Sequence, residues 1–224
     1  MATNSLPNAE ALQSTLDRMN WRDNIIILAL FVLAGVFTLT SPVFLTAENL
    51  INILRQTAIV GVLGVGMTFA IISAEIDISI GGITAVSAML AAMTLSAGYP
   101  WFVGIAVCLS VGLGFGLLNG AITVRVGIPS FLVTLGMLGV TSGLALIVTN
   151  TQPVRVQTAA LFTVFSGQVG PIPVIVIWAA VVVVIGHLVL SRTRFGKHVY
   201  ATGDDTQAAR YTGVNTDRIK ILTL

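Results

Sequence analysis

Two carboxylates and a serine lie close together between long apolar segments of the sequence. Glu75, Asp77 and Ser79 separate an apolar run that ends at Ala74 from another that starts at Ile80. Ionisable side chains in such surroundings are costly to remove from water, and those found there usually line a polar path or lie at a water boundary. We therefore expect them to act in gating or in a translocation path. The alternative is a solvated loop in which Asp77 or Ser79 caps the next helix.

Few other residues could do chemistry. The two histidines, His187 and His198, have no partner at the spacing of metal ligands, and the single cysteine, Cys108, lies within an apolar run. No nucleophile elbow, zinc-protease motif or phosphate-binding loop occurs, and the Gly196-Lys197 dipeptide is followed by histidine. We expect no catalytic residue, no metal site and no cofactor in this chain. If ATP drives its activity, another subunit must hydrolyse it.

A second polar segment covers residues 191–220, which is more chain than a tight turn between two apolar runs requires. Residues 204–211 predict a short helix, with Asp204 or Asp205 at its N-terminus and Gly213 near its C-cap. A short exposed helix is suited to docking into a groove on a partner. The residues that we expect to make this contact are Asp204, Gln207, Ala208, Ala209, Arg210 and Gly213.

The composition places most of the chain in lipid. Hydrophobic residues make up 55% of the 224 positions and charged residues only 9%, whereas soluble domains average about a quarter charged residues. A soluble fold of this size could not bury so much apolar surface. The net charge of +2 and the absence of a basic run with interleaved aromatics argue against a nucleic-acid partner.

The apolar runs predict an all-α fold, a polytopic transmembrane helical bundle with about six spans, because one span needs roughly 20 apolar residues. We expect a single transmembrane domain over residues 1–224, with a tail at 1–23, the spans within 24–190 and the polar segment at 191–220. Residues 41–56 are expected to form a linker and residues 125–130 a tight turn. The predicted spans are 24–40, 57–74, 80–96, 101–124, 131–149 and 172–190.

Lysine and arginine indicate the orientation of the spans. With an even number of spans, the N-terminal tail and residues 191–220 lie on one side, which collects most of the positive charges, while Arg55 and Arg155 fall on the other. Positive charges accumulate on the cytosolic side of membrane proteins. The N-terminus and the second polar segment are therefore expected in the cytosol.

Glycines recur every four residues in two of the predicted spans, at 112, 116 and 120 and again at 139 and 143. Small residues at this spacing form a groove in which helix backbones approach closely. We expect these glycines to mark helix contacts; the alternative is that glycine is simply common in spanning helices. Asn119, Thr134 and Thr141 are polar residues within spans that could line a path, or could serve polar packing between helices.

Several motifs follow one another in an order that is typical of one family. They are Val-Gly-Met-Thr at 65–68, Glu-Ile-Asp-Ile-Ser-Ile-Gly at 75–81, Leu-Leu-Asn-Gly at 117–120, Ile-Pro-Ser-Phe-Leu-Val-Thr-Leu-Gly at 128–136, Arg-Thr-Arg-Phe-Gly at 192–196 and Tyr-Ala-Thr-Gly at 200–203. Through these motifs the sequence resembles the permease subunits of bacterial ABC importers for ribose, xylose, galactose and related small sugars. The match is spread over nearly the whole chain.

The resemblance implies translocation of a monosaccharide across the bacterial inner membrane by a permease homodimer. It also implies a cytosolic ABC ATPase subunit that binds ATP and contacts the polar segment, and a periplasmic sugar-binding protein. The family pattern Glu-Ala-Ala-x-x-x-Gly is matched by Gln207, Ala208, Ala209 and Gly213, with glutamine in place of glutamate. Because such permeases carry further spans after this segment, the resemblance also implies truncation at the C-terminus.

Two other functions remain open at this point. A secondary transporter or channel would use ionisable groups within its spans for ion coupling, and of the predicted spans only the sixth offers one, at His187. A non-transporting membrane scaffold would display the polar segment and bind a partner without moving a solute.

Overall fold

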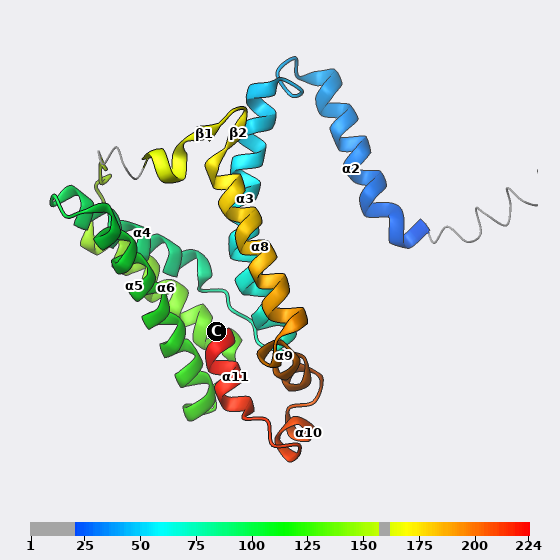
Figure 1. The fold of residues 1–224 in the computed structure, drawn as a ribbon, viewed down its shortest axis with the longest axis vertical. Coiled ribbons are helices and arrows are strands. Elements are labelled where there is room, and N and C mark those ends of the chain that lie inside the picture. Colours follow the sequence, from blue (N-terminus) through cyan, green and yellow to red (C-terminus); the bar gives the residue numbers. More distant parts are fainter. Residues whose placement is uncertain (1–20, 157–161) are drawn as a thin grey trace, which may run out of the picture. The chain divides into compact units, whose positions relative to one another are not determined.

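The computed structural model describes residues 21–156 and 162–224. The chain divides into two compact units, one up to Ile53 and the other from Leu54 to Leu224. Helices dominate both units, so the prediction of an all-α fold is confirmed (Figure 1). The prediction of a single domain over residues 1–224 stays a prediction.

The first unit contains α2 (Trp21–Thr40) and the start of α3 (Ala47–Ile72). The expected linker at 41–56 is wrong, because α3 begins at Ala47. Thr46 precedes the helix and its Oγ1 accepts a hydrogen bond from the backbone nitrogen of Asn49 at 3.4 Å, while the Asn49 side chain donates to the carbonyl of Phe44 at 2.8 Å. These local bonds satisfy groups at the helix start and limit the connection to a short turn.

The second unit contains a bundle of three helices, α4 (Ile80–Ser96), α5 (Trp101–Ala121) and α6 (Ser130–Val148). Helix α4 packs against both α5 and α6 (Figure 1). Two glycines allow this approach: a Cβ at Gly104 would lie 2.8 Å from the side chain of Leu95, and one at Gly82 would meet Thr141 Oγ1. Close backbone approach is the usual basis of helix association in lipid.

The expected tight turn at 125–130 is shorter than predicted. A π-helical turn, η1 (Ile122–Val126), continues α5, and Gly127 then reverses the chain with a left-handed φ of +79°. Pro129 stands at the N-cap of α6, and proline cannot continue a preceding helix. The reversal therefore occupies only the residues between η1 and α6.

The region between α6 and α8 (Val174–Arg192) contains a π-helical turn, η2 (Phe162–Ser166), and a hairpin that the sequence did not predict. Strand β1 (Gln168–Val169) pairs antiparallel with β2 (Ile172–Pro173), and Gly170 supplies the left-handed conformation of the turn, with φ +60°. Helix α8 follows β2 directly.

The polar segment forms three short helices, α9 (Arg194–Asp204), α10 (Thr206–Tyr211) and α11 (Thr216–Thr223), which we call the C-terminal helices. Asp205 caps α10 by accepting hydrogen bonds from the backbone nitrogens of Gln207 and Ala208 at 2.8 and 3.0 Å. Gly213 has a φ of +89° just after α10. The predicted short helix with an aspartate cap and a nearby glycine is confirmed; Asp204 belongs to α9.

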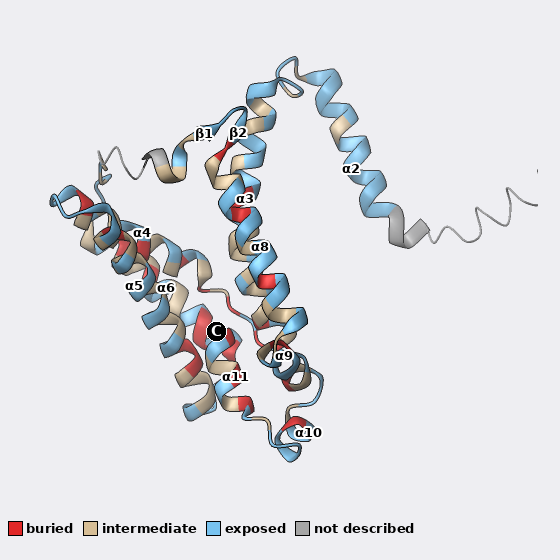
Figure 2. Cartoon of the chain, in the orientation of Figure 1, coloured by how far each residue is buried: buried red, intermediate tan, exposed pale blue. Residues whose placement is uncertain are grey.

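Six helices of the described residues are apolar. Four of them, Ala47–Ile72, Trp101–Val126, Ser130–Val148 and Val174–Arg192, are long and apolar enough to cross a membrane, and Ile25–Thr40 and Ile80–Ser96 are shorter. Large apolar side chains stay exposed along them, whereas buried residues gather where α4, α5, α6 and α11 meet (Figure 2). Exposed apolar surface on this scale is stable when lipid covers it. The structure is that of a multi-pass helical membrane protein.

Candidate functional site

Helix α3 ends at Ile72 and α4 starts at Ile80, and we call the residues between them, 73–79, the break segment. Ala74 has a left-handed φ of +61°, and the backbone nitrogen of Glu75 donates to the carbonyl of Ala70 at 2.9 Å. This pattern closes a helix C-terminus, although a residue with a Cβ is strained in it. Helix α3 thus ends at a specific left-handed residue, and a buried polar segment follows it.

The centre of the break segment is a chain of buried polar side chains. Asp77 Oδ1 accepts hydrogen bonds from the backbone nitrogen and the hydroxyl of Ser79, at 2.7 and 2.6 Å. The side-chain nitrogen of Asn119 on α5 donates to the same hydroxyl at 2.8 Å. Asn119 and Ser79 are fully buried and Asp77 is 7% exposed. Ser79 occupies the N-cap position of α4 without capping it through its side chain, and the burial of Asp77 and Ser79 does not fit a solvated loop.

Helix α6 satisfies the backbone of the break segment. The backbone nitrogen of Ile76 donates to Ser130 Oγ and that of Ile78 donates to Thr134 Oγ1, both at 3.1 Å. Thr134 also donates to the carbonyl of Ile76 at 3.1 Å. Non-helical backbone within a membrane protein must find such partners, because lipid offers none.

Helix α11 binds the break segment through two side chains one turn apart. Lys220 Nζ lies 2.6 Å from Glu75 Oε1, and the side chains are 22% and 6% exposed. The hydroxyls of Ser73 and Thr223 are 2.8 Å apart. Helix α9 reaches the same region, since a Cβ on Gly203 would meet the Ile72 carbonyl.

The predicted gating residues meet at this one place. Glu75, Asp77, Ser79, Asn119 and Thr134 all belong to the network around the break segment. Thr141 lies apart, fully buried, donating to the carbonyl of its own helix at Met137, at 2.7 Å. Four further residues belong to the same network and were not singled out in the sequence: Ser73, Ser130, Lys220 and Thr223.

The residues expected to contact a partner differ in exposure. Asp204, Gln207, Ala208 and Arg210 are exposed, whereas Ala209 is buried at 4%. Arg210 is tied to α11: its Nε donates to Thr216 Oγ1 at 2.7 Å and its guanidinium pairs with Asp217.

Tyr211 follows on α10 and is 90% exposed. Spacings of three and four residues place side chains on one helix face. Gln207, Ala208 and Tyr211 are therefore the outward face of α10.

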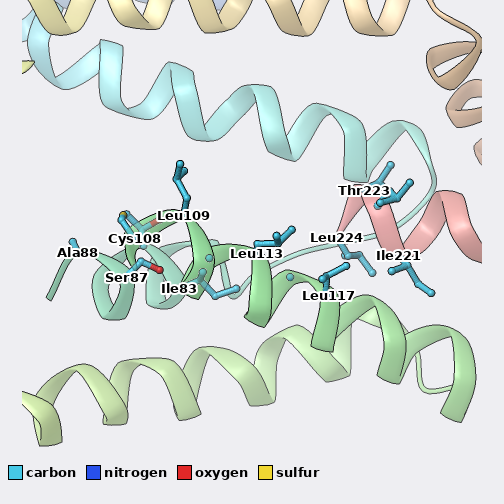
Figure 3. A pocket seen from close by; sticks show the side chains of 14 residues that line it. Ile83, Ser87, Ala88, Cys108, Leu109, Leu113, Leu117, Ile221, Thr223 and Leu224 are labelled. Carbon is cyan, nitrogen blue, oxygen red and sulfur yellow. The ribbon is translucent and has the colours of Figure 1, made fainter. Parts of the chain in front are cut away.

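Residues of α11 line part of two pockets. One of about 190 Å³ is lined by Asp77 together with residues of α3, α4, α5 and α11, among them Gly66, Met67 and Thr223. The other, of about 550 Å³, is mostly apolar and lies between α4, α5 and α11, with Ser87 and Cys108 at one end and Leu224 at the other (Figure 3). Within the described residues no group of three or more histidine, cysteine or acidic side chains could hold a metal ion.

The matched part of the chain includes the break segment and the C-terminal helices. The model of the family described as "Branched-chain amino acid transport system / permease component" matches residues 49–224. The chain belongs to this permease family.

Curated relatives of the permease agree with this assignment. The chain is 32% identical to the ribose import permease protein of Escherichia coli K12 over 200 residues, which are 88% of this chain and 62% of the relative. It is 31% identical to the ribose import permease protein of Haemophilus influenzae, over 87% of this chain and 61% of the relative.

The L-arabinose ABC transporter permease protein of Azospirillum brasilense is 35% identical over 88% of this chain and 58% of its own length. The permease thus spans less than two thirds of these relatives. No solved structure matches it. The resemblance to sugar-importer permeases is confirmed, and its relatives are permease components rather than enzymes.

Proposed function

We propose that this permease is the transmembrane subunit of an ABC importer that moves a small sugar across the bacterial inner membrane. Relatives named for ribose and L-arabinose import support the class of substrate. The structural observation that carries the proposal is the direct attachment of the C-terminal helices to a buried break between two apolar helices. A movement imposed on the C-terminal helices thereby reaches the buried break segment.

ATP binding and hydrolysis belong to a separate cytosolic ATPase subunit. The outward face of α10, formed by Gln207, Ala208 and Tyr211, is the surface on which that subunit docks. A periplasmic sugar-binding protein delivers the sugar to the opposite side, and two permease chains enclose the path. Lipid covers the remaining apolar surface.

The mechanism is alternating access. Closure of the ATPase pair displaces α10, which is linked to α11 through Arg210, Thr216 and Asp217. Helix α11 in turn holds the break segment, where Asp77, Ser79, Asn119 and Thr134 form the gate. Polar residues at such a gate stay hydrogen-bonded in each state, because unpaired polar groups in the bundle are costly.

The docking surface is tested by Ala208→Glu. Ala208 is exposed on the outward face, so a glutamate there leaves the fold intact and places a charged side chain in the docking contact. Ala209→Glu is the poorer test, because Ala209 is buried and the substitution disturbs α10 itself. We expect Ala208→Glu to abolish co-purification with the ATPase and uptake of labelled ribose or L-arabinose. The matched control is Ala97→Glu, at an exposed alanine that ends α4.

The outcomes separate the three functions. Loss of binding and uptake in Ala208→Glu, with both retained in Ala97→Glu, is the result expected of an importer subunit. Uptake by the permease without any ATPase indicates a secondary transporter. Binding of the ATPase without uptake of either sugar indicates a scaffold.

A further inference from the structure

The contact between α11 and the break segment has a geometry that goes beyond a docking role for α10. Lys220 and Thr223 lie on one face of α11 and reach Glu75 and Ser73, which flank the left-handed residue Ala74. The two contacts therefore hold the point at which α3 ends. Any displacement of α11 along its axis acts on that point.

The Lys220–Glu75 pair is partly withdrawn from water, with Glu75 only 6% exposed. Removing two opposite charges from water costs about as much as their attraction returns, so such a pair adds little net stability. Removing one partner, however, leaves a charge that nothing balances. The pair therefore fixes a position more than it stabilises the fold.

A neighbouring face of α11, formed by Ile221 and Leu224, offers little resistance to sliding along α5. It lies on α5 over two glycines: a Cβ on Gly120 would be 2.6 Å from Ile221 Cα, and one on Gly116 would be 3.1 Å from the Leu224 carbonyl. Without side chains, these glycines form no ridge that interlocks with α11. The polar contacts at Lys220 and Thr223 therefore set the position of α11 along α5.

We infer that Lys220 is a positioning residue, which acts through Glu75 to transmit the displacement of the C-terminal helices to the break segment. This inference rests on the proposed function. It adds one link between the ATPase contact and the gate: α10 moves α11 through Arg210, and α11 moves the break segment through the ion pair. Ser73 and Thr223 supply a second, uncharged contact beside it.

The test uses a reporter in the break segment of the assembled importer. Ile76 is 49% exposed, so Ile76→Cys in a Cys108→Ala background reacts with a water-soluble maleimide at a measurable rate. The permease is reconstituted with its ATPase, and the rate is compared with and without a non-hydrolysable ATP analogue. Co-purification of the ATPase is measured in every sample.

Four variants and one control are compared. Lys220→Met and Glu75→Gln each leave one charge of the pair without its partner. The double neutral variant combines these two substitutions and leaves no charge. A second double variant, Glu75→Lys with Lys220→Glu, exchanges the two charges. The control is Arg218→Met, which removes an exposed cation from the same helix.

We expect the ATP analogue to change the labelling rate in the parent and in Arg218→Met. In Lys220→Met and in Glu75→Gln we expect most of this change to be lost. The double neutral variant decides the question. It leaves no unbalanced charge and folds as well as the parent, yet we expect it to lack the response, while the exchanged pair recovers it. A purely structural contact predicts the opposite, a full response in the double neutral variant, and that result overturns the inference. Failure of the parent to bind the ATPase counts against the proposed function instead.

Discussion

Ser79 shows how a single hydroxyl can hold together three parts of the network around the break segment. It donates to Asp77 Oδ1, accepts from Asn119 and stands at the start of α4, with no exposure to solvent. Asn119 Oδ1 has no hydrogen-bond partner among the described residues, so the bond from the Asn119 side-chain nitrogen to Ser79 anchors that buried amide. A buried amide with so few partners depends strongly on each of them.

Replacing Ser79 by alanine tests this dependence. We expect Ser79→Ala to lower the free energy of unfolding by about 1–3 kcal/mol, because it leaves the Asn119 amide and one Asp77 contact unsatisfied in a buried place. The measurement is thermal unfolding of the purified permease in detergent. Thr84→Ala is the control, since the Thr84 hydroxyl is exposed and bonds the carbonyl of Ile80 in its own helix. Equal melting temperatures for the two variants would contradict the prediction.

Residues of the site differ in how visible they are in the sequence. Glu75, Asp77 and Ser79 stand out because carboxylates between apolar runs need a reason to be there. Lys220 and Thr223 do not stand out, because lysine is ordinary at the end of a polar segment and threonine is ordinary beside an apolar run. Only the folded chain brings Thr223 to Ser73, 150 positions away. Contacts of this kind depend on tertiary packing, which no local pattern encodes.

At the scale of elements, glycine spacing predicted close packing but not the partner. Gly116 and Gly120 do allow a backbone to approach, and that backbone belongs to α11, a short helix in the segment expected to be polar and exposed. A Cβ added at Gly139 or Gly143 would meet no atom of the described chain within 4 Å, so the second glycine pair marks no contact there. The spacing of the glycines identifies a helix face without large side chains, but it does not identify the helix that packs there.

Gly120→Ala tests the contact between α5 and α11. The new methyl group would lie 2.6 Å from Ile221 Cα, a backbone atom that cannot turn aside. We expect a loss of about 1–3 kcal/mol, typical of overpacking, together with faster proteolysis of α11.

The control for this variant is Gly136→Ala, on an exposed face of α6 with no atom within 4 Å. Alanine there should be neutral or stabilise the helix by about 0.5–1 kcal/mol. Proteolysis of α11 at the same rate in both variants would show that α11 does not depend on this contact.

The sequence predicts the ends of a helix well where the composition changes sharply. It predicts them poorly where a helix extends beyond its apolar run into polar residues. Helix α4 matches the expected 80–96, because the charged break segment precedes it and Gly98, with a left-handed φ of +89°, follows its C-cap. Helix α3 starts ahead of its predicted span, since Glu48, Asn52 and Arg55 are typical of a linker but lie on a helix. Polar residues near the membrane boundary do not end a helix, because long charged side chains can extend toward water while the backbone stays helical.

At the scale of the whole molecule, charge and exposure together predict the sidedness of the chain. Most lysines and arginines lie in or near the C-terminal helices or at the N-terminus, and this asymmetry favours a cytosolic location for both. The turn between α4 and α5 carries Gly98 and Tyr99 and no charge. We expect that turn on the periplasmic side.

Two exposed tyrosines give a matched test of this orientation. Tyr99, in the turn after α4, is 58% exposed and Tyr211, at the end of α10, is 90% exposed. Each is replaced by cysteine in a Cys108→Ala background, and intact cells with a permeable outer membrane are treated with a membrane-impermeant maleimide. We expect Tyr99→Cys to react directly and Tyr211→Cys to react only after the inner membrane is opened. Reaction of Tyr211→Cys in intact cells would place α10 outside, beyond the reach of any ATPase, and the importer mechanism would fail with it.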